Sequence, residues 1–241
     1  MKVAIIGLGV IGALHAELAT LNADLVAVCD VNEARLAPYT NVKKYVDYRQ
    51  MLDEVKPDVV HVCTPHYLHA EMVVEALHRD INVLCEKPLC INLSELNVIL
   101  HAEKESEAQL GVCLQNRYLS VNQYAKEFLQ ENPPITGMGY VSWQRGKEYY
   151  LSSPWRGKKE TEGGGVLINQ ALHTLDLLQW FCGDAATVRA SLSNLTLQGV
   201  IDVEDTACVL CEGKAPFTFF ATNGGATNFP VEISILTERD S

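Results

Sequence analysis

The sequence predicts an α/β protein: an N-terminal doubly wound parallel sheet, followed by an α+β domain built on an open, mostly antiparallel sheet. Two observations predict the first part. The glycine pattern G-x-G-x-x-G comes directly after the apolar run 3–6, and continuous apolar strands then alternate with helical patterns. Beyond about residue 116, strand-like runs follow one another with few helices between them, which is typical of an antiparallel sheet. We therefore expect two domains, residues 1–116 and 117–241.

The glycine pattern consists of Gly7, Gly9 and Gly12. Gly7 permits a tight turn, Gly9 lets the backbone approach a pyrophosphate, and Gly12 lets the next helix pack closely on the strand. The helix start, at Val10 and Ile11, offers N–H groups and the positive end of the helix dipole to phosphates. The pattern predicts a Rossmann dinucleotide-binding domain. The alternative is that the glycines serve only a turn.

The second apolar strand ends in an acid, Asp30. A carboxylate at this place accepts hydrogen bonds from the ribose hydroxyls of a dinucleotide and repels a 2′-phosphate. The sequence therefore favours NAD as the cofactor over NADP.

The alternation of strands and helices continues beyond Asp30. We expect further strands at 59–63, 81–85 and 110–114, and helices at 48–55, 68–79 and 92–107. Parallel sheets of this type bind ligands at the carboxyl ends of their strands. The cofactor contacts expected at these ends are Thr64, Pro65, His66, Glu86, Lys87 and Gln115. His69 is expected to cap the helix that follows.

The second domain is expected to begin with a helix at 121–130, which Pro133 and Pro134 end. One further helix is expected at 165–181. The strand-like runs are 139–145, 187–193, 206–211, 217–222 and 231–237.

Composition excludes several classes of function. The net charge of −11 disfavours nucleic acid as a partner, because binding to phosphates needs basic patches. No stretch has the length of a membrane span, and the glycines in the N-terminal apolar run argue against a signal peptide, so we expect a cytoplasmic protein without a membrane partner. Cys208 and Cys211 form the only C-x-x-C pair, and without a second pair we expect no metal site and reduced thiols.

Lys87 is the first candidate for chemistry. It follows a buried strand within Glu86-Lys87-Pro88, where partial desolvation lowers the pKa of an amine toward a range useful for acid–base catalysis. Pro88 fixes the turn and, in the cis form, would aim the lysine side chain. The alternative is an ordinary surface turn.

The second candidate is the segment that follows Gly163-Gly164-Gly165. The expected helix would place Asn169, His173 and Asp176 on one face, where polar side chains either have partners or line a site. A histidine in such a helix is more often a satisfied core residue. Lys87 and the cofactor motif favour a site.

Together with the run from Cys63 to His69, these motifs resemble the Gfo/Idh/MocA oxidoreductases over nearly the whole chain. The resemblance implies NAD(P)-dependent oxidation or reduction of a CH–OH group in a sugar, a sugar derivative or a cyclitol. The usual catalytic pair of the family maps to Lys87 and His173, which would hold the substrate hydroxyl and accept its proton. Asn169 would fix the sugar ring.

The sequence departs from the family in two respects. Many members carry Asp where this chain has Asn169, and an amide orients a hydroxyl without acting as a base. Asn169-Gln170 is similar to a subgroup that includes UDP-hexosaminuronate dehydrogenases, which leaves the substrate open. Family members are also usually longer, so the chain is either a fragment or has a partner subunit at its exposed sheet edge. We expect a homo-oligomer formed through the C-terminal sheet.

Trp155 and Arg156 are secondary candidates, because an arginine near the cleft can bind cofactor phosphates or an anionic substrate. The alternative is that they lie in a solvated loop. Two other functions remain open for the whole chain: a non-catalytic NAD-binding regulator and a truncated, inactive homologue.

Overall fold

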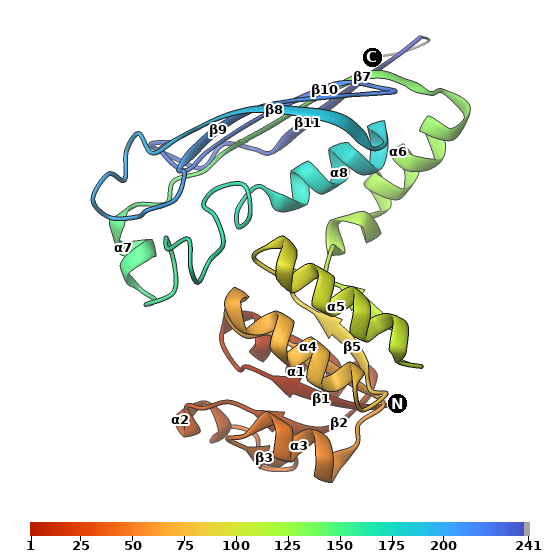
Figure 1. Cartoon of the computed structure of the whole chain (residues 1–241), viewed down its shortest axis with the longest axis vertical. Coiled ribbons are helices and arrows are strands. Elements are labelled where there is room, and N and C mark those ends of the chain that lie inside the picture. Colours follow the sequence, from red (N-terminus) through yellow and green to blue (C-terminus); the bar gives the residue numbers. More distant parts are fainter. Residues whose placement is uncertain (239–241) are drawn as a thin grey trace. The chain divides into compact units, whose positions relative to one another are not determined.

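The computed structural model describes residues 1–238 and divides into two compact units, Met1–Cys113 and Leu114–Ser241 (Figure 1). Each unit is built around one sheet.

The first unit contains a six-stranded sheet of order β3-β2-β1-β4-β5-β6, in which all neighbouring strands are parallel. The order reverses between β1 and β4, and ligands of doubly wound sheets bind at such a switch point. The predicted Rossmann topology is confirmed, whereas the short strand β3 was not predicted. The strands are β1 (Lys2–Ile6), β2 (Asp24–Cys29), β3 (Lys43–Tyr45), β4 (Val59–Val62), β5 (Asn82–Cys85) and β6 (Leu110–Val112).

Helices cover both faces of this sheet because successive strand residues point to opposite sides. Val3 and Ile5 pack in one core with Ala16 of α1, and Ala4 and Ile6 pack in the other with residues of α3, α4 and α5. The helices of this unit are α1 (Val10–Asn22), α2 (Glu33–Leu36), α3 (Tyr48–Val55), α4 (His69–Leu77) and α5 (Leu93–Glu105), with a 3-10 turn, η1 (His66–Leu68).

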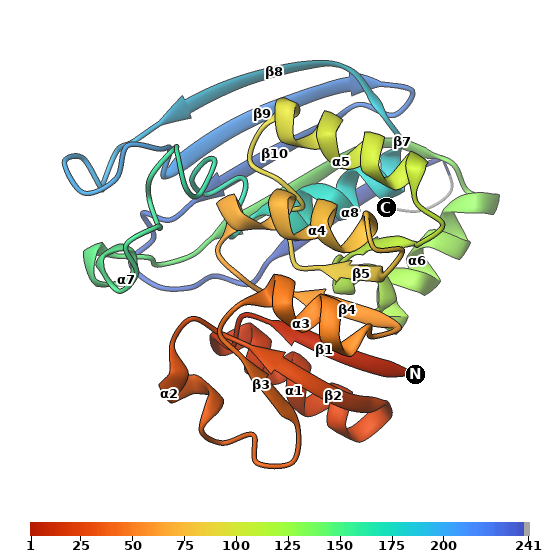
Figure 2. The ribbon, with the colours of Figure 1, turned by 60° about the horizontal axis from the view of Figure 1, so that its bottom comes forward.

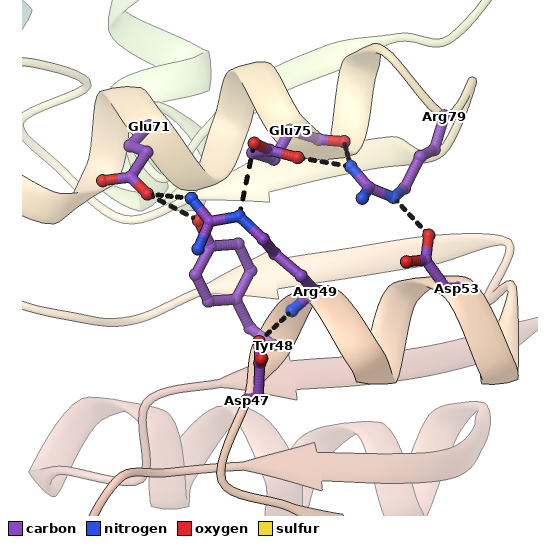
Figure 3. A network of polar contacts seen from close by, with 7 residues as sticks. All are labelled: Asp47, Tyr48, Arg49, Asp53, Glu71, Glu75 and Arg79. Atoms are coloured by element: carbon purple, nitrogen blue, oxygen red, sulfur yellow. Dashed lines mark hydrogen bonds and ion pairs between the residues drawn. The ribbon is translucent and has the colours of Figure 1, made fainter.

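A network of charged side chains joins α3 to α4 (Figure 3). Arg49 donates to the carboxylates of Glu71 and Glu75, while Arg79 donates to Glu75 and, at 2.7 Å, to Asp53. The side chains are between 26% and 62% exposed, so solvent screens each pair and each contributes at most about 1 kcal/mol. The network fixes the orientation of α4, whose first residues follow the loop after β4.

The second unit contains a five-stranded sheet of order β11-β7-β10-β9-β8. Only β7 and β10 pair in parallel, and the other neighbours are antiparallel, which confirms the predicted mostly antiparallel sheet. Figure 2 shows β8, β9 and β10 side by side. The strands are β7 (Pro134–Ser142), β8 (Ala185–Ser193), β9 (Thr206–Gly213), β10 (Phe217–Thr222) and β11 (Glu232–Thr237).

Helix α8 (Leu172–Cys182) packs on one face of this sheet. Gly137 and Gly139 of β7 make room for it, because a Cβ atom at Gly139 would lie 2.5 Å from Cδ1 of Leu178. The other helical segments of this unit are η2 (Gln115–Tyr118), α6 (Ser120–Glu131) and α7 (Lys147–Leu151).

The expected strand 139–145 is wrong in position, because β7 begins at Pro134 and ends at Ser142. Pro134 was read only as a helix stop. A proline is tolerated at the first residue of a strand, where its missing N–H costs no ladder hydrogen bond.

Within residues 1–238, the helices are all too short or too polar to cross a membrane. The eight cysteines are free thiols, and Cys208 is exposed whereas Cys211 is buried, as expected for residues on opposite faces of a strand.

Asp205 orders the turn before β9. The carboxylate is buried and accepts hydrogen bonds from the backbone N–H groups of Leu195, Thr196 and Leu197. Burial raises the pKa of this carboxyl, but the hydrogen bonds outweigh burial and hold the pKa below its usual range.

We expect Asp205→Asn to lower the free energy of unfolding by about 2–3 kcal/mol at neutral pH, because the amide cannot carry the charge that these donors stabilise. A lowered pKa in the folded state stabilises the fold above the unfolded pKa, and this stability is lost as pH falls through the folded pKa. Urea unfolding of the wild type and of Asp205→Asn from pH 7 to pH 3 measures how this stability difference depends on pH. The exposed Asp184→Asn is the control, and an equal gap between Asp205→Asn and wild type at every pH would contradict the assignment.

Candidate cofactor and active site

The glycine loop between β1 and α1 has a distinct requirement at each glycine. Gly7 has a φ of +88°, and a Cβ atom there would lie 2.8 Å from the carbonyl oxygen of Cys63. A Cβ atom at Gly12 would lie 1.8 Å from the carbonyl oxygen of Gly7. At Gly9, nothing lies within 4 Å of the Cβ position. Gly7 and Gly12 are therefore required by the fold itself, whereas Gly9 leaves open space beside the helix start.

Helix α1 begins at Val10, and no side chain caps it. The N–H groups of the first turn have no partner within a helix, so those of Val10, Ile11 and Gly12 can bind an anion. The side chain of Val10 is 96% exposed, which is unusual for a valine at the start of a helix that packs on a central sheet. The loop therefore has the geometry of a pyrophosphate site.

Asp30 lies at the end of β2 and is only 5% exposed. Its carboxylate accepts hydrogen bonds from the N–H of Leu8 at 2.7 Å and of Asn32 at 2.8 Å, and the guanidinium of Arg35 lies 3.3 Å away. Asp30 thus ties the glycine loop to β2. An ionised carboxylate has about four lone-pair sites, so capacity remains for a ribose hydroxyl.

The loops after β4 and β5 are joined by His69. One ring nitrogen lies 2.7 Å from the carbonyl oxygen of Pro88 and the other 2.8 Å from that of Thr64. Burial lowers the pKa of His69, although both carbonyl oxygens favour the charged ring. The expectation that His69 caps the next helix is wrong, because its side chain is used between the two loops instead.

Thr64 and Pro65 are half-buried at the end of β4, and His66 is buried in the first turn that follows. The peptide bond between Lys87 and Pro88 is cis, which is the form considered from the sequence as one that would aim the lysine side chain. Lys87 is half-buried directly after β5. These residues lie at the carboxyl edge of the parallel sheet, where the sequence places them.

Glu86 faces away from solvent and belongs to a polar cluster within the first unit. Its carboxylate lies 3.1 Å from Nε2 of His15, and the N–H of Lys87 donates to its other oxygen at 3.2 Å. Burial raises the pKa of Glu86, but these interactions outweigh it and lower the pKa. Glu86 is therefore charged at neutral pH and fixes the backbone of Lys87.

The helix expected at 165–181 begins only at Leu172, so Asn169 does not share a helix face with His173 and Asp176. Glu204 binds the start of this segment, because its carboxylate accepts hydrogen bonds from the N–H groups of Gly165 and Leu167. The backbone of Gly165 also passes so close to Glu204 that a Cβ atom would lie 1.7 Å from its carbonyl oxygen. The glycine run thus approaches another part of the chain, and no helix forms there.

Asn169 lies in a polar network of the second unit. Its amide donates to the buried carboxylate of Glu162 and, at 3.3 Å, to the hydroxyl of Tyr149. Gln170 also donates to Tyr149, at 3.2 Å, and accepts from Asn223 at 3.0 Å. The orientation of the Asn169 amide is therefore fixed by Glu162, seven residues earlier, and by Tyr149, 20 residues earlier.

His173 is the second residue of α8, and its Nε2 lies 3.3 Å from the amide nitrogen of Gln115. One turn later, Asp176 accepts two hydrogen bonds from Arg117, at 2.8 Å and 2.5 Å. This pair joins η2 to α8. Gln115 and His173, both predicted from the sequence, thus lie together.

Arg156 lies over the ring of Tyr149, 4.4 Å from its centre, and donates to Ser152. Among residues 1–238, Arg156 forms no ion pair with an acid, and its buried Nε has no hydrogen-bond partner. Trp155, half-buried, lies beside it, with 5.5 Å between the indole ring and the guanidinium carbon. Arg156 is therefore a cation without an acidic partner, and it lies beside Tyr149, which accepts a hydrogen bond from Asn169. Such a guanidinium is suited to bind an anion.

Three residues of these networks were missed from the sequence. Neither sequence spacing nor residue pattern singles out His15, Tyr149 or Glu204, because their partners lie at least 20 residues away along the chain.

Two family models together match most of the chain. Residues 1–114 match the model described as "Oxidoreductase family, NAD-binding Rossmann fold", and residues 135–239 match the "GFO/IDH/MocA C-terminal domain". The chain belongs to the Gfo/Idh/MocA family of oxidoreductases. The resemblance inferred from the motifs is confirmed.

Solved structures of this family superpose on nearly the whole chain. The WlbA dehydrogenase from Bordetella pertussis, in complex with NADH and UDP-GlcNAcA, has a TM-score of 0.90 at 28% identity and covers 98% of this chain and 75% of its own. The WlbA dehydrogenase from Chromobacterium violaceum, in complex with the same two molecules, has a TM-score of 0.88 at 30% identity, with coverages of 99% and 72%.

Among curated family members, D-glucoside 3-dehydrogenase of Escherichia coli (strain K12) is 32% identical over 192 residues, which is 76% of this chain and 54% of that enzyme. This chain spans about half the length of the curated relatives it matches. The second such relative, 27% identical over 196 residues, is the myo-inositol 2-dehydrogenase of Thermotoga maritima, so both are dehydrogenases by name.

Proposed function

We propose that this protein is an NAD-dependent dehydrogenase of the CH–OH group of an anionic sugar derivative, with a sugar nucleotide that carries a uronate as the leading substrate. The observation that carries this proposal is Arg156, a guanidinium without an acidic partner among the described residues, in the same network as Asn169. The two similar WlbA dehydrogenases hold UDP-GlcNAcA, which is an anion of this kind.

Lys87 and His173 are proposed as the acid–base pair of this reaction. When bound, NAD supplies the hydride acceptor. Lys87 and His173 hold the substrate hydroxyl and accept its proton, and Asn169, whose amide is fixed by Glu162 and Tyr149, orients the sugar ring. In the first unit, Gly9 and the N–H groups of Val10 and Ile11 bind the pyrophosphate.

Other proposed cofactor contacts lie at the ends of the strands and in the second unit. They are Thr64, Pro65, His66, Glu86, Gln115 and Trp155.

The substrate proposal is tested by turnover of the full chain with UDP-GlcNAcA, D-glucose and myo-inositol as separate substrates. We expect NADH to form with the anionic substrate. Arg156→Met should raise KM for it by about 10-fold or more, because a charge-assisted hydrogen bond contributes about 1.5–3 kcal/mol. Lys214→Met is the control, since Lys214 is an exposed cation of the same unit and lies outside the network of Asn169. Turnover of only the neutral sugars would contradict the proposal, and tight NAD binding without any turnover would favour the regulator.

Cofactor choice is tested at Asp30. We expect the wild type to prefer NAD, and Asp30→Asn to reduce the preference for NAD over NADP about 10-fold, because the substitution removes a negative charge that repels a 2′-phosphate. Steady-state kinetics with both cofactors measures the ratio. Arg35→Ala should increase the preference for NAD over NADP, because the substitution removes the exposed cation that lies beside the Asp30 carboxylate. A wild-type preference for NADP would contradict the role of Asp30.

We further propose that a second copy of the chain binds the sheet face opposite α8. Tyr140 and Phe220 stack there, 5.6 Å apart, beside exposed Met138. Arg189 and Glu232 line the same hollow and give it opposite charges at its edges. Light scattering of the wild type and Phe220→Lys tests this: we expect a dimer or larger assembly that the lysine disrupts.

The free thiols fit a reducing compartment such as the cytoplasm.

A further inference from the structure

Four polar side chains meet inside the first unit, each from a different element. His15 comes from α1, His61 from β4, Glu86 follows β5 and Cys113 follows β6. Nε2 of His15 lies 3.1 Å from Oε1 of Glu86, and Nδ1 of His15 lies 3.1 Å from Nδ1 of His61. The dehydrogenase chemistry proposed above has no use for His15, His61 or Cys113.

Three ligand atoms of this cluster, from His15, Glu86 and Cys113, suit one metal ion. One nitrogen of His15, one oxygen of Glu86 and the sulfur of Cys113 all lie within 4.8 Å of one another. Zn²⁺ takes these donors at about 2.0–2.3 Å in a tetrahedron, which places neighbouring ligand atoms about 3.5 Å apart. Only small side-chain movements are therefore needed. Glu86 and His15 are 11% and 12% exposed at their side chains, so the cluster differs from acidic groups scattered on a surface.

His61 occupies the place of an outer partner. A histidine that binds a metal through Nε2 usually donates its Nδ1–H to another group, which fixes the ring orientation. In one neutral tautomer, His61 carries a lone pair at Nδ1, 3.1 Å from Nδ1 of His15. In that tautomer, the contact between the two histidines has the direction that metal binding requires.

We propose that His15, Glu86 and Cys113 form a binding site for a divalent ion of the zinc type, with His61 orienting His15. The three ligands leave the fourth tetrahedral position to water. The Cys113 thiol loses its proton to solvent as the sulfur–metal bond forms. The ion would tie α1 to the ends of β5 and β6 next to Lys87, and its binding can be measured without any assay of the reaction that the protein catalyses.

The probe is Co²⁺, which takes the same ligands as Zn²⁺ and absorbs light when a thiolate binds it. We expect the full chain to bind one Co²⁺ with a thiolate-to-cobalt band in the near ultraviolet. Cys113→Ser should remove the band, and the exposed Cys208→Ser should retain it. Absence of the band in the wild type, or its retention in Cys113→Ser, overturns the proposal and leaves the cluster as a set of hydrogen bonds that positions Glu86.

A second variant guards against a folding defect in Cys113→Ser. His61→Leu keeps all three ligands, and the loss of an outer partner lowers metal affinity by about 10–100-fold. We expect this decrease in a Co²⁺ titration with the band still present at saturation. Thermal unfolding of the same samples should show stabilisation by Co²⁺ in the wild type and not in Cys113→Ser. Equal affinity in His61→Leu and wild type would remove His61 from the site, and equal stabilisation of Cys113→Ser would overturn the site itself.

Discussion

Replacing Lys87 by alanine is expected to lower kcat by about 10²–10⁴-fold, which is the usual contribution of a positioned acid–base group. Lys87 lies at the carboxyl end of β5, and the N–H of Lys87 and the carbonyl of Pro88 are held by Glu86 and His69. These contacts involve the backbone, so the substitution should leave the loop intact. NAD binding, measured by thermal stabilisation, is therefore expected to persist.

The exposed Lys104→Ala removes the same charge from the same unit and should turn over at the wild-type rate. His173→Ala should also lower kcat. If Lys87 and His173 act on one hydroxyl, the double variant should lose much less than the product of the two single effects. A wild-type rate of turnover in Lys87→Ala would contradict the assignment of Lys87 as an acid–base group.

Replacing Gly12 by alanine is expected to cost at least about 3 kcal/mol of unfolding free energy, because the added methyl overlaps a backbone atom that cannot turn away. The Cβ atom would lie 1.8 Å from the carbonyl oxygen of Gly7. Relief requires a shift of α1 or of the loop, and either shift also moves the N–H groups proposed to bind the pyrophosphate.

Gly9→Ala provides the matched comparison. Its φ of −67° suits any residue, and nothing lies within 4 Å of the added methyl. The unfolding free energy should change by about 1 kcal/mol or less, while NAD affinity falls because the methyl enters the space left for the phosphates. Urea unfolding and NAD titration of both variants separate the two roles. Equal stability of the two variants, or unchanged NAD affinity in Gly9→Ala, would contradict this division.

The glycine loop was predictable because its requirements are local. The spacing of Gly7 and Gly12 brings the carbonyl oxygen of Gly7 against the first turn of α1 at Gly12. The apolar strands on each side of the loop fix where the loop lies. Lys87 was placed by the same logic, since a residue that follows a parallel strand lies at the binding edge.

The predictions that were wrong concern segments controlled by distant residues. Glu204 binds the N–H groups at Gly165 and Leu167, and periodicity within 165–181 contains no sign of it. The strand β3 has one buried residue, Tyr45, and exists through pairing with β2. His15 and Cys113 meet beside Glu86 only because the sheet order brings α1, β5 and β6 together.

The parallel pairing of β7 with β10 bears on how the chain folds during translation. Gly137 of β7 pairs with Phe217 of β10, and its other neighbour, β11, is synthesised later still. While the intervening residues are being made, β7 has neither edge covered, whereas every strand of the first sheet has already left the ribosome. The nucleotide-binding half can therefore reach its native form cotranslationally, and the exposed glycine-rich strand of the second half is the segment on which a chaperone would be most needed.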